Sequence, residues 1–512
     1  MRIFSVFLII IFYGVNCSAQ IDSRRLSRSV SASIDNEVAP YISANGKALV
    51  FMLKDSFSGK WSVEYSRKSG GDWERSQSVD VINKSDKLNQ IGGCCLSPDG
   101  NTLYYTTKKY GGLGNSDIWQ TNRSKTGTWS EPQNLGKPIN TAQFDANPCI
   151  SADGKFMYFM RCNSLSNTTT ECCKIFVAER KGKSGWNEPV ALPAPINMGC
   201  ESTPRIAADG KTLFFASKRT GGQGGLDIYI SRNEGGVWSE PIPVVEMNTK
   251  MDDQYVSMAG RENLVYYSAQ GDETQDLFKG KLPEKYQPSA VTILDGRVVD
   301  AVTDGTTRGV VVITDLQNDK VVFRDLTEKA DGSFYAFLPA GSVYDLEVKS
   351  FEKKHLFYST TIDTRDQTKY KYSLLKTPLE PMKSGAEALL KGVTAENGAL
   401  TTEAKLELKR VLDVVKNAPQ NQVYLLISRP VAPVTEVEST DSTLSSSDAI
   451  EPVGNADVSD VAVLKPLIET FYTSLKVPDG KVAIELVSPN DSRVSKFTAE
   501  SGGTESVTLY LK

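Results

Sequence analysis

The chain has 512 residues, of which 40% are hydrophobic and 23% charged, and its 58 Lys+Arg against 62 Asp+Glu give a net charge of −4. That length predicts about three domains of about 150 residues each, and the apolar content excludes wholesale disorder. Because basic residues do not outnumber acidic ones, we do not expect the chain to bind nucleic acid. The single histidine, His355, stands far from any nucleophile motif. We therefore expect no histidine-based triad, no metal site and no cofactor.

Residues 1–19 have the pattern of a secretory signal peptide, with an arginine after the initial methionine, an apolar run from Ile3 to Val15, and small residues up to Ala19. The run is shorter than the ~20 residues that span a bilayer, and no later segment comes near that length. We expect cleavage before Gln20 and export to the periplasm or to the periplasmic face of the outer membrane. The alternative is a lipid anchor on Cys17, although the three residues before it form a poor lipobox.

The cysteines that follow the signal peptide are clustered in one part of the chain. They are Cys94, Cys95, Cys149, Cys162, Cys172, Cys173 and Cys200. Export permits disulfides, and the odd count leaves one thiol over. Cys162 could close a hairpin with Cys172 or with Cys173. Burial as small apolar residues is the alternative for Cys95 and Cys149.

A turn motif recurs along the first half of the chain. Its copies end in glycines spaced 54, 54, 56 and 50 residues apart, at Gly46, Gly100, Gly154, Gly210 and Gly260. Each turn precedes an apolar strand. Further along the repeat come an Asp-apolar-aromatic strand, a Trp-x-Glu-Pro segment and an asparagine. Their copies are Asp117, Asp227 and Asp276; Trp129, Trp186 and Trp238, with Trp73 as a degenerate first copy; and Asn83, Asn140, Asn197 and Asn248.

Short strands between Gly, Asp and Asn turns at this period predict one four-stranded propeller blade per repeat. The last copy lacks its Trp-x-Glu-Pro strand, which the stretch from Leu26 to Pro40 could supply to close the ring. We therefore predict a β-propeller over residues 20–285 with five blades, six being the alternative. The repeated aspartates are interpreted as turn or blade-contact residues.

Two segments of this repeat resemble the WD-repeat-like, TolB-type propellers of bacterial envelope proteins. They run from Ser97 to Tyr105 and from Lys218 to Tyr229. The Gly-rich stretches 111–114 and 221–225 lack the Lys-Ser/Thr ending of a phosphate loop and are predicted to be turns between strands.

Short strands continue over residues 286–376 without the period, which predicts a small β-sandwich. Its pattern from Gly296 to Asp300 and from Asp331 to Gly341 resembles the carboxypeptidase regulatory-like family, whose fold is non-catalytic. His355, near the end of this segment, is interpreted as a surface residue.

Residues 377–512 predict an α/β domain with a helix capped by Thr401 or Thr402, and an acidic, Ser/Thr-rich insert over 431–457 that is expected to be disordered. The segment from Gly398 to Ile427 resembles the OmpA-like peptidoglycan-binding family, a βαβαββ fold. That family holds diaminopimelate with an Asp at a strand end and an Arg on the next helix. Pro430 stands at the Asp position here, and the following helix has no Arg. We therefore expect a degenerate OmpA-like domain that binds peptidoglycan weakly or not at all.

Propeller, sandwich and OmpA-like domain in this order resemble Bacteroidota envelope proteins, including a periplasmic component associated with type IX secretion. The resemblance implies a non-catalytic envelope scaffold, not an enzyme, whose propeller binds a protein partner such as a secretion-system component. The alternative is a propeller enzyme or glycan-binding protein that acts on wall or extracellular polysaccharide through paired carboxylates.

Overall fold

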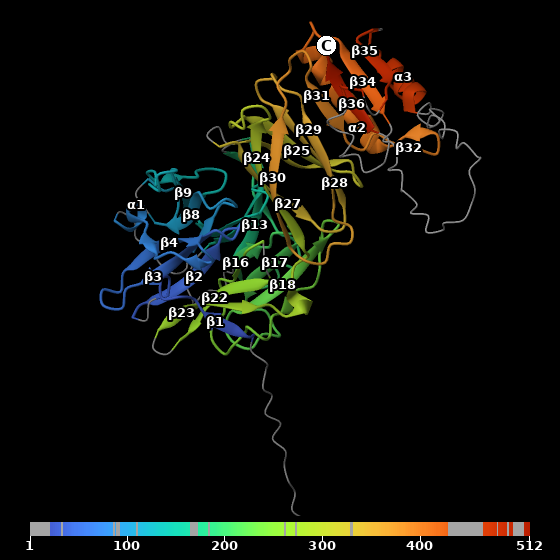
Figure 1. Cartoon of the computed structure of the whole chain (residues 1–512). Coiled ribbons are helices and arrows are strands. Elements are labelled where there is room, and N and C mark those ends of the chain that lie inside the picture. The colour runs from blue at the N-terminus through green and yellow to red at the C-terminus, as the bar shows by residue number, and fades with distance from the viewer. Residues whose placement is uncertain are drawn as a thin grey trace, which may run out of the picture. The chain divides into compact units, whose positions relative to one another are not determined.

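The chain forms two compact units, unit 1 over residues 1–291 and unit 2 over residues 292–512. The computed structural model describes residues 21–31, 34–84, 88, 93–108, 111–163, 173–182, 185–260, 263–271, 274–327, 331–428, 464–478, 480–488, 491–494 and 506–512. The expected signal peptide, Cys17 and the 431–457 insert therefore lie outside the described residues, as do Arg429 and Pro430. The structure is mainly β, and unit 1 has a propeller-type fold (Figure 1).

Unit 1 consists of five antiparallel sheets, numbered here in chain order. Sheet 1 contains β2 (Asn36–Ile42), β3 (Ala48–Lys54), β4 (Trp61–Ser69), β5 (Asp72–Trp73) and β6 (Gln77–Ser78), followed by the short helix α1 (Asp80–Asn83). Sheet 2 contains β7 (Cys94–Leu96), β8 (Thr102–Thr107), β9 (Asp117–Asn122) and β10 (Gln133–Asn134). Sheet 3 contains β11 (Phe144–Ile150), β12 (Phe156–Cys162), β13 (Lys174–Lys181), β14 (Gly185–Trp186) and β15 (Val190–Ala191). Sheet 4 contains β16 (Glu201–Ile206), β17 (Thr212–Ser217), β18 (Asp227–Glu234), β19 (Val237–Trp238) and β20 (Ile242–Pro243). Sheet 5 contains β21 (Ser257–Met258), β22 (Leu264–Gln270), β23 (Gln275–Lys281) and β1 (Ser23–Arg25), and the short helix η2 (Glu284–Tyr286) follows it.

The N-terminal strand closes the ring of sheets. β1 pairs with β23, and Figure 1 shows this blue strand beside the yellow-green β22 and β23. On the inner side, the backbone N–H of Ile42 in β2 donates to Ser257 Oγ in β21 at 2.9 Å, which joins sheet 1 to sheet 5. An N-terminal segment thus completes the last repeat, although the paired strand is Ser23–Arg25 and lies just before the expected stretch.

The asparagine that ends each repeat makes two hydrogen bonds with the third strand of its own sheet, one as acceptor and one as donor. Asn140 Oδ1 accepts from the N–H of Ile118 at 2.9 Å, and its Nδ2 donates to the carbonyl of Ile118 at 2.8 Å. Asn248 makes the same pair of bonds with Ile228. An amide side chain can satisfy a backbone donor and acceptor together, which explains why this position of the repeat is an asparagine.

Aromatic and aliphatic side chains fill the space between the sheets. One large cluster takes residues from sheets 1 to 4, and two others join sheet 5 to sheets 4 and 1. The repeat tryptophans Trp73, Trp186 and Trp238 are buried, while Trp129 is half-buried and meets Tyr65 of sheet 1 edge-on, with ring centroids 5.2 Å apart. The recurring aromatics therefore pack sheet against sheet, as radial stacking requires.

Unit 2 begins with two sheets that enclose a small core. One has the order β27 (Ser333–Pro339), β24 (Val291–Asp300), β30 (Lys371–Leu379). The other has the order β26 (Lys320–Leu326), β25 (Gly309–Asp315), β28 (Val343–Ser350), β29 (Tyr358–Asp363). Alternating burial along β25 and β28 marks strands with one face on the core.

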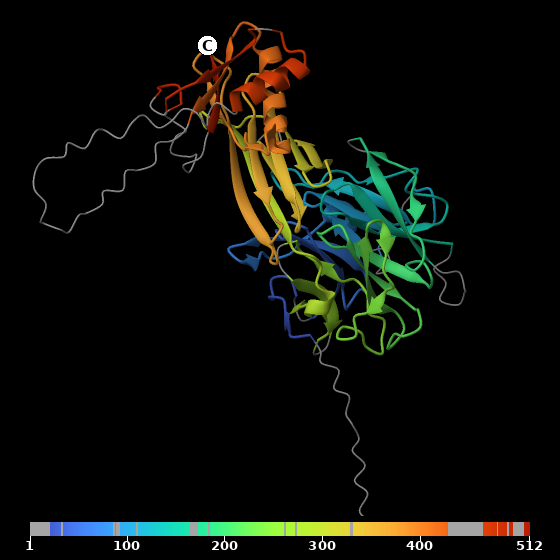
Figure 2. The same cartoon turned by 90° about the vertical axis from the view of Figure 1, so that its right-hand side faces the viewer.

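The rest of unit 2 is a four-stranded sheet with two helices packed against it through a shared hydrophobic core. The sheet order is β31 (Glu387–Leu390), β36 (Ser506–Leu511), β34 (Val423–Ser428), β35 (Val482–Leu486). The helices are α2 (Thr402–Asn417) and α3 (Leu464–Ser474), orange and red in Figure 2, and a hairpin of β32 (Ala395–Glu396) and β33 (Ala399–Leu400) precedes α2. Thr401 caps α2 by accepting from the N–H of Ala404 at 3.2 Å. Because both segments belong to one compact unit, the division at residue 377 stays a prediction.

Candidate functional site

Four carboxyl groups stand at equivalent positions of the repeat in unit 1, three of them in the inner strands β2, β11 and β16 and the fourth in the segment just before β21. Each lies two residues before a residue with positive φ, where the inner strand bulges in sheets 1, 3 and 4. We call Glu37, Asp145, Glu201 and Asp253 the carboxyl set. The face of unit 1 at which the inner strands begin is called the front face. Because strands alternate in direction, the loops between the second and third strands of each sheet lie on this face too.

Buried ion pairs and loop contacts hold the carboxyl set in place. Asp145 Oδ1 accepts from Arg161 Nε at 2.6 Å, and its other oxygen accepts from the backbone N–H of Thr141 at 2.7 Å. Glu201 Oε1 accepts from Arg219 Nη2 at 2.9 Å and from the N–H of Gly199 at 2.6 Å. These carboxylates therefore fasten the incoming loop to the first strand of their sheet.

Burial raises the pKa of three members of the set, Asp145, Glu201 and Asp253. Glu201 is fully buried, and among the described residues its Oε2 has no hydrogen-bond partner. Asp253 is only half-buried. In glycoside cleavage a carboxyl group with a raised pKa donates a proton and works with a second carboxylate.

The repeated aspartates of the third strands hold the Gly-rich loops of the front face. Asp117 accepts from the backbone N–H groups of Leu113 and Gly114, and Asp227 accepts from those of Gln223 and Gly224. In sheet 5, Asp276 instead pairs with Arg25 of β1 at 2.6 Å. These contacts are structural, as the repeat spacing indicated.

Loops of the front face also carry exposed apolar side chains. Met198 and Met251 precede the inner strands of sheets 4 and 5 and are 71% and 74% exposed, while Leu113 is 47% exposed. Methionine adapts its shape readily to a partner, so exposed methionines suit a contact surface.

The cysteines divide into bonded and buried groups. Cys162 at the end of β12 and Cys173 just before β13 form a disulfide. Cys200 is also disulfide-bonded. Cys94, Cys95 and Cys149 are free thiols, all buried in the inner strands β7 and β11. Among the described residues there is no group of three His, Cys, Asp or Glu that could hold a metal ion.

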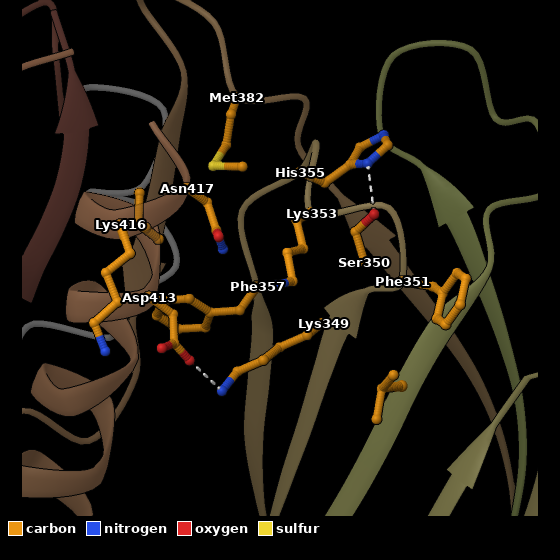
Figure 3. A pocket seen from close by; sticks show the side chains of 12 residues that line it. Lys349, Ser350, Phe351, Lys353, His355, Phe357, Met382, Asp413, Lys416 and Asn417 are labelled. Carbon is orange, nitrogen blue, oxygen red and sulfur yellow. Dashed lines mark hydrogen bonds and ion pairs between the residues drawn. The ribbon is translucent and has the colours of Figure 1, made fainter. Parts of the chain in front are cut away.

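Unit 2 contains a cavity of about 450 Å³ beside the C-terminal end of α2 and the turn after β28 (Figure 3). Its charged lining includes Lys349, whose ammonium lies 2.7 Å from Asp413 Oδ2, and Lys353 and Lys416. Its apolar lining is Val310, Phe351, Phe357, Met382 and Val414. The mixture would suit an anionic ligand with an apolar part, but the carboxylates that pair with Lys349 already neutralise its charge.

His355 lies at the rim of this cavity and not on the open surface. Its side chain is only 14% exposed, with Nε2 3.0 Å from Asp300 Oδ2 and Nδ1 3.2 Å from Ser350 Oγ. The backbone N–H of Thr303, together with His355, lowers the pKa of Asp300. The interpretation of His355 as a surface residue was wrong, because the sequence does not show that the turn folds back onto β24.

The carboxyl set was missed at the sequence level, although a signal was present. Three of its members begin an acid-x-x-Pro pattern, which ends at Pro40, Pro148 and Pro204. Aligning the repeats on these prolines would have placed the acids in one register. It would not have revealed their burial, which depends on the neighbouring strands.

No protein-family model matches the chain, and no curated protein matches it. Among solved structures it is similar to an α-L-arabinofuranosidase from Lactobacillus brevis, at 13% identity over 51% of this chain and 96% of that one, with a TM-score of 0.35. An endo-arabinase from Bacteroides thetaiotaomicron matches at 14% identity over 51% and 98%, also with a TM-score of 0.35. A putative TolB from Agrobacterium tumefaciens matches at 16% identity over 60% and 91%, with a TM-score of 0.29.

These structures include a TolB-type propeller and several propeller enzymes, and at such identities the likeness concerns the fold. The prediction that the chain is not an enzyme is contradicted, because glycan-cleaving enzymes stand among the similar structures. Within the described part of the chain, no helix is long and apolar enough to span a membrane.

Proposed function

We propose that the chain is an exported five-bladed propeller protein that binds a wall or extracellular polysaccharide at its front face and cleaves it through carboxyl groups of the inner strands. The observation that carries this proposal is the carboxyl set, in which four repeats carry an acid at an equivalent position and burial raises the pKa of three. Two members of the set would provide the paired acids that glycoside hydrolysis can use without a histidine or a metal.

Glu201 is the proton donor in this proposal. Burial raises its pKa, and its Oε2 has no partner among the described residues, whereas Oε1 accepts from Arg219 and Gly199. Asp253 of the neighbouring sheet is the second carboxyl, because it is the member of the three that is only half-buried and so can meet water.

The test uses the purified chain without residues 1–19 and a panel of wall and extracellular polysaccharides. Binding is measured by affinity electrophoresis and cleavage by the release of reducing ends. Glu201→Gln keeps the acceptor for Gly199 and removes the acid, so kcat is expected to fall about 10²-fold or more while binding persists.

Asp276→Asn is the matched control, since that carboxylate pairs with Arg25 of β1 and has no part in the proposed cleavage, so kcat should stay within about twofold. Unfolding curves of both variants are recorded to check that they remain folded. If no polysaccharide is bound or cleaved by the wild-type chain, the proposal fails.

Binding of a protein partner in the envelope is a second proposal, supported by the exposed Met198 and Met251 of the front face. The partner would be an envelope protein, with a secretion-system component of the type IX kind as the first candidate. Crosslinking in cells followed by affinity purification should recover one partner with the wild-type chain. The double variant Met198→Ser/Met251→Ser should lose it. Val237→Ser, which removes an exposed side chain from the hairpin at the opposite face, should retain it.

A further inference from the structure

One position of each inner strand in unit 1 faces the axis of the ring. The five residues there follow the positive-φ residue by two places, and all are buried: Tyr41, Cys95, Cys149, Arg205 and Ser257. Tyr41 of sheet 1 has its hydroxyl 3.9 Å from Cys149 Sγ of sheet 3, and its ring centroid lies 5.1 Å from the guanidinium carbon of Arg205 of sheet 4. Sheet 1 is flanked by sheets 2 and 5, so these side chains can meet only on the axis.

Small side chains at this position bond the next sheet, whereas Arg205 does not. Ser257 accepts from the N–H of Ile42, and the thiols of Cys95 and Cys149 are hydrogen-bonded by the backbone of Ile150 and Ile206. Acceptors of this kind join the inner strands around the ring. A guanidinium has no acceptor atom, so Arg205 cannot accept a hydrogen bond from the next sheet as Ser257 and the thiols do. Instead it brings a positive charge to the axis.

The charge of Arg205 is not balanced by the described residues. Arg205 is only 4% exposed. Its Nη1 donates to the carbonyls of Pro148 at 3.4 Å and Pro204 at 2.8 Å. Nε and Nη2 are buried and have no hydrogen-bond partner among the described residues. By contrast, the buried Arg410 of unit 2 contacts three carboxylates.

The neighbouring thiols and phenol do not serve as counterions. Burial raises the pKa of Cys94 to about 12 and also raises the pKa of Cys95, Cys149 and Tyr41. These groups are therefore neutral at physiological pH. Arginine cannot escape by losing its proton, and an uncompensated buried charge costs several kcal/mol.

We propose that the axis of the propeller holds a small carboxylate-like oxyanion, of the size of formate or bicarbonate, on Nε and Nη2 of Arg205. These two nitrogens form one edge of the guanidinium fork, and their parallel N–H bonds match the two oxygens of a carboxylate. The ring of Tyr41 lies against the guanidinium, and the neutral thiols add no competing negative charge. Because the position is buried within the ring, a small anion is selected over a large one.

The anion has a structural consequence for the front face. It would neutralise Arg205 where the inner strands converge, so the ring that supports the carboxyl set would be most rigid when the anion is bound. This role is independent of whether the front face cleaves a glycan.

The test measures the unfolding temperature of unit 1 in the full mature chain, first in an anion-poor zwitterionic buffer. Potassium formate or bicarbonate is then compared with potassium gluconate, which matches the ionic strength but is too large for the axis. Formate should raise the unfolding temperature saturably, by about 5–10 °C at a hundredfold excess over its Kd. Gluconate should cause no saturable rise.

Three variants locate the effect. Arg205→Met should abolish the response to formate. Arg205→Lys keeps the charge but lacks the fork, so it should respond equally to formate and chloride. Arg161→Met, which removes a guanidinium that is already paired with Asp145, should unfold at a lower temperature and still respond to formate.

NMR line broadening of ¹³C-labelled formate by the wild-type chain supplies a measurement that needs no variant, and saturable broadening is expected. If water alone satisfies Nε and Nη2, formate will act no differently from gluconate and will show no saturable broadening. Either that result or a full formate response in Arg205→Met overturns the proposal.

Discussion

Two buried arginines, one in each unit, are treated very differently by their surroundings. Arg410 on α2 pairs with Glu407 of the same helix and with Asp345 and Glu347 of β28, so three carboxylates surround one guanidinium. Arg205 in β16 contacts two carbonyls and one aromatic ring and has no carboxylate partner among the described residues. The same side chain is a fixed structural link in unit 2 and an unmatched charge in unit 1.

The comparison shows that burial of a charge is not itself a sign of function. The Arg410 cluster is fully explained by packing, because it links α2 to the sandwich sheet through hydrogen-bonded pairs. Packing alone does not explain the buried position of Arg205, so we attribute it to the proposed anion. Replacing each arginine by a neutral residue should therefore have opposite consequences.

The largest effect is expected from Arg410→Met. It would leave three carboxyl groups buried without their cation, which costs about 3–5 kcal/mol when one partner of a buried pair is removed. Urea unfolding followed by a probe in unit 2 measures the loss. Arg365→Met, in an exposed and solvent-screened pair with Asp363, is the control and should cost far less. Equal losses in the two variants would show that the cluster contributes no more than a surface pair.

Asn248→Ala should weaken unit 1 by about 1–3 kcal/mol, because the buried N–H and carbonyl of Ile228 would lose their partners. Thermal unfolding of unit 1 is the measurement. Asn233→Ala, which removes only a bond to the N–H of Gly236 at an exposed hairpin, is the matched control. A loss no greater than the control would mean that the terminal asparagine of the repeat is dispensable for the sheet.

Glu407 should make the stability of unit 2 depend on pH. Burial raises its pKa from 4.5 to about 7, so the folded state binds the proton more tightly than the unfolded state. Its contribution to stability is then fully present below about pH 4.5 and is lost as the pH rises through about 7. Glu407→Gln should flatten the curve of unfolding free energy against pH over this window. A slope that persists in the variant would assign the dependence to another group.

The smallest effect is expected from Arg205→Met in anion-poor buffer. Removing an unmatched buried charge should change the stability of unit 1 by less than about 1 kcal/mol, or increase it. Chemical unfolding at low ionic strength gives the value. A loss as large as that of Arg410→Met would show that Arg205 has an internal partner after all, and the contrast between the two arginines would disappear.

Much of the fold of unit 1 follows from local sequence alone. The Asp-Gly turns, the apolar strands after them and the terminal asparagines are local devices that recur at a regular spacing, so they indicate a strand order before any long-range contact is considered. Gly100 is an example: its φ of 80° suits glycine, and a Cβ there would lie 2.8 Å from the Cβ of Ala48 in the next sheet.

What only the tertiary structure decided is how side chains from separate repeats combine. Sequence spacing placed Arg205, Tyr41 and Cys149 in different repeats, and only closure of the ring brings them onto one axis. The burial of Glu201 beside Arg219 and the threefold pairing of Arg410 depend in the same way on contacts between distant strands. Local propensity sets the elements, whereas the environment of a charged group, and with it the chemistry that group can perform, is set by neighbours that are far away in the chain.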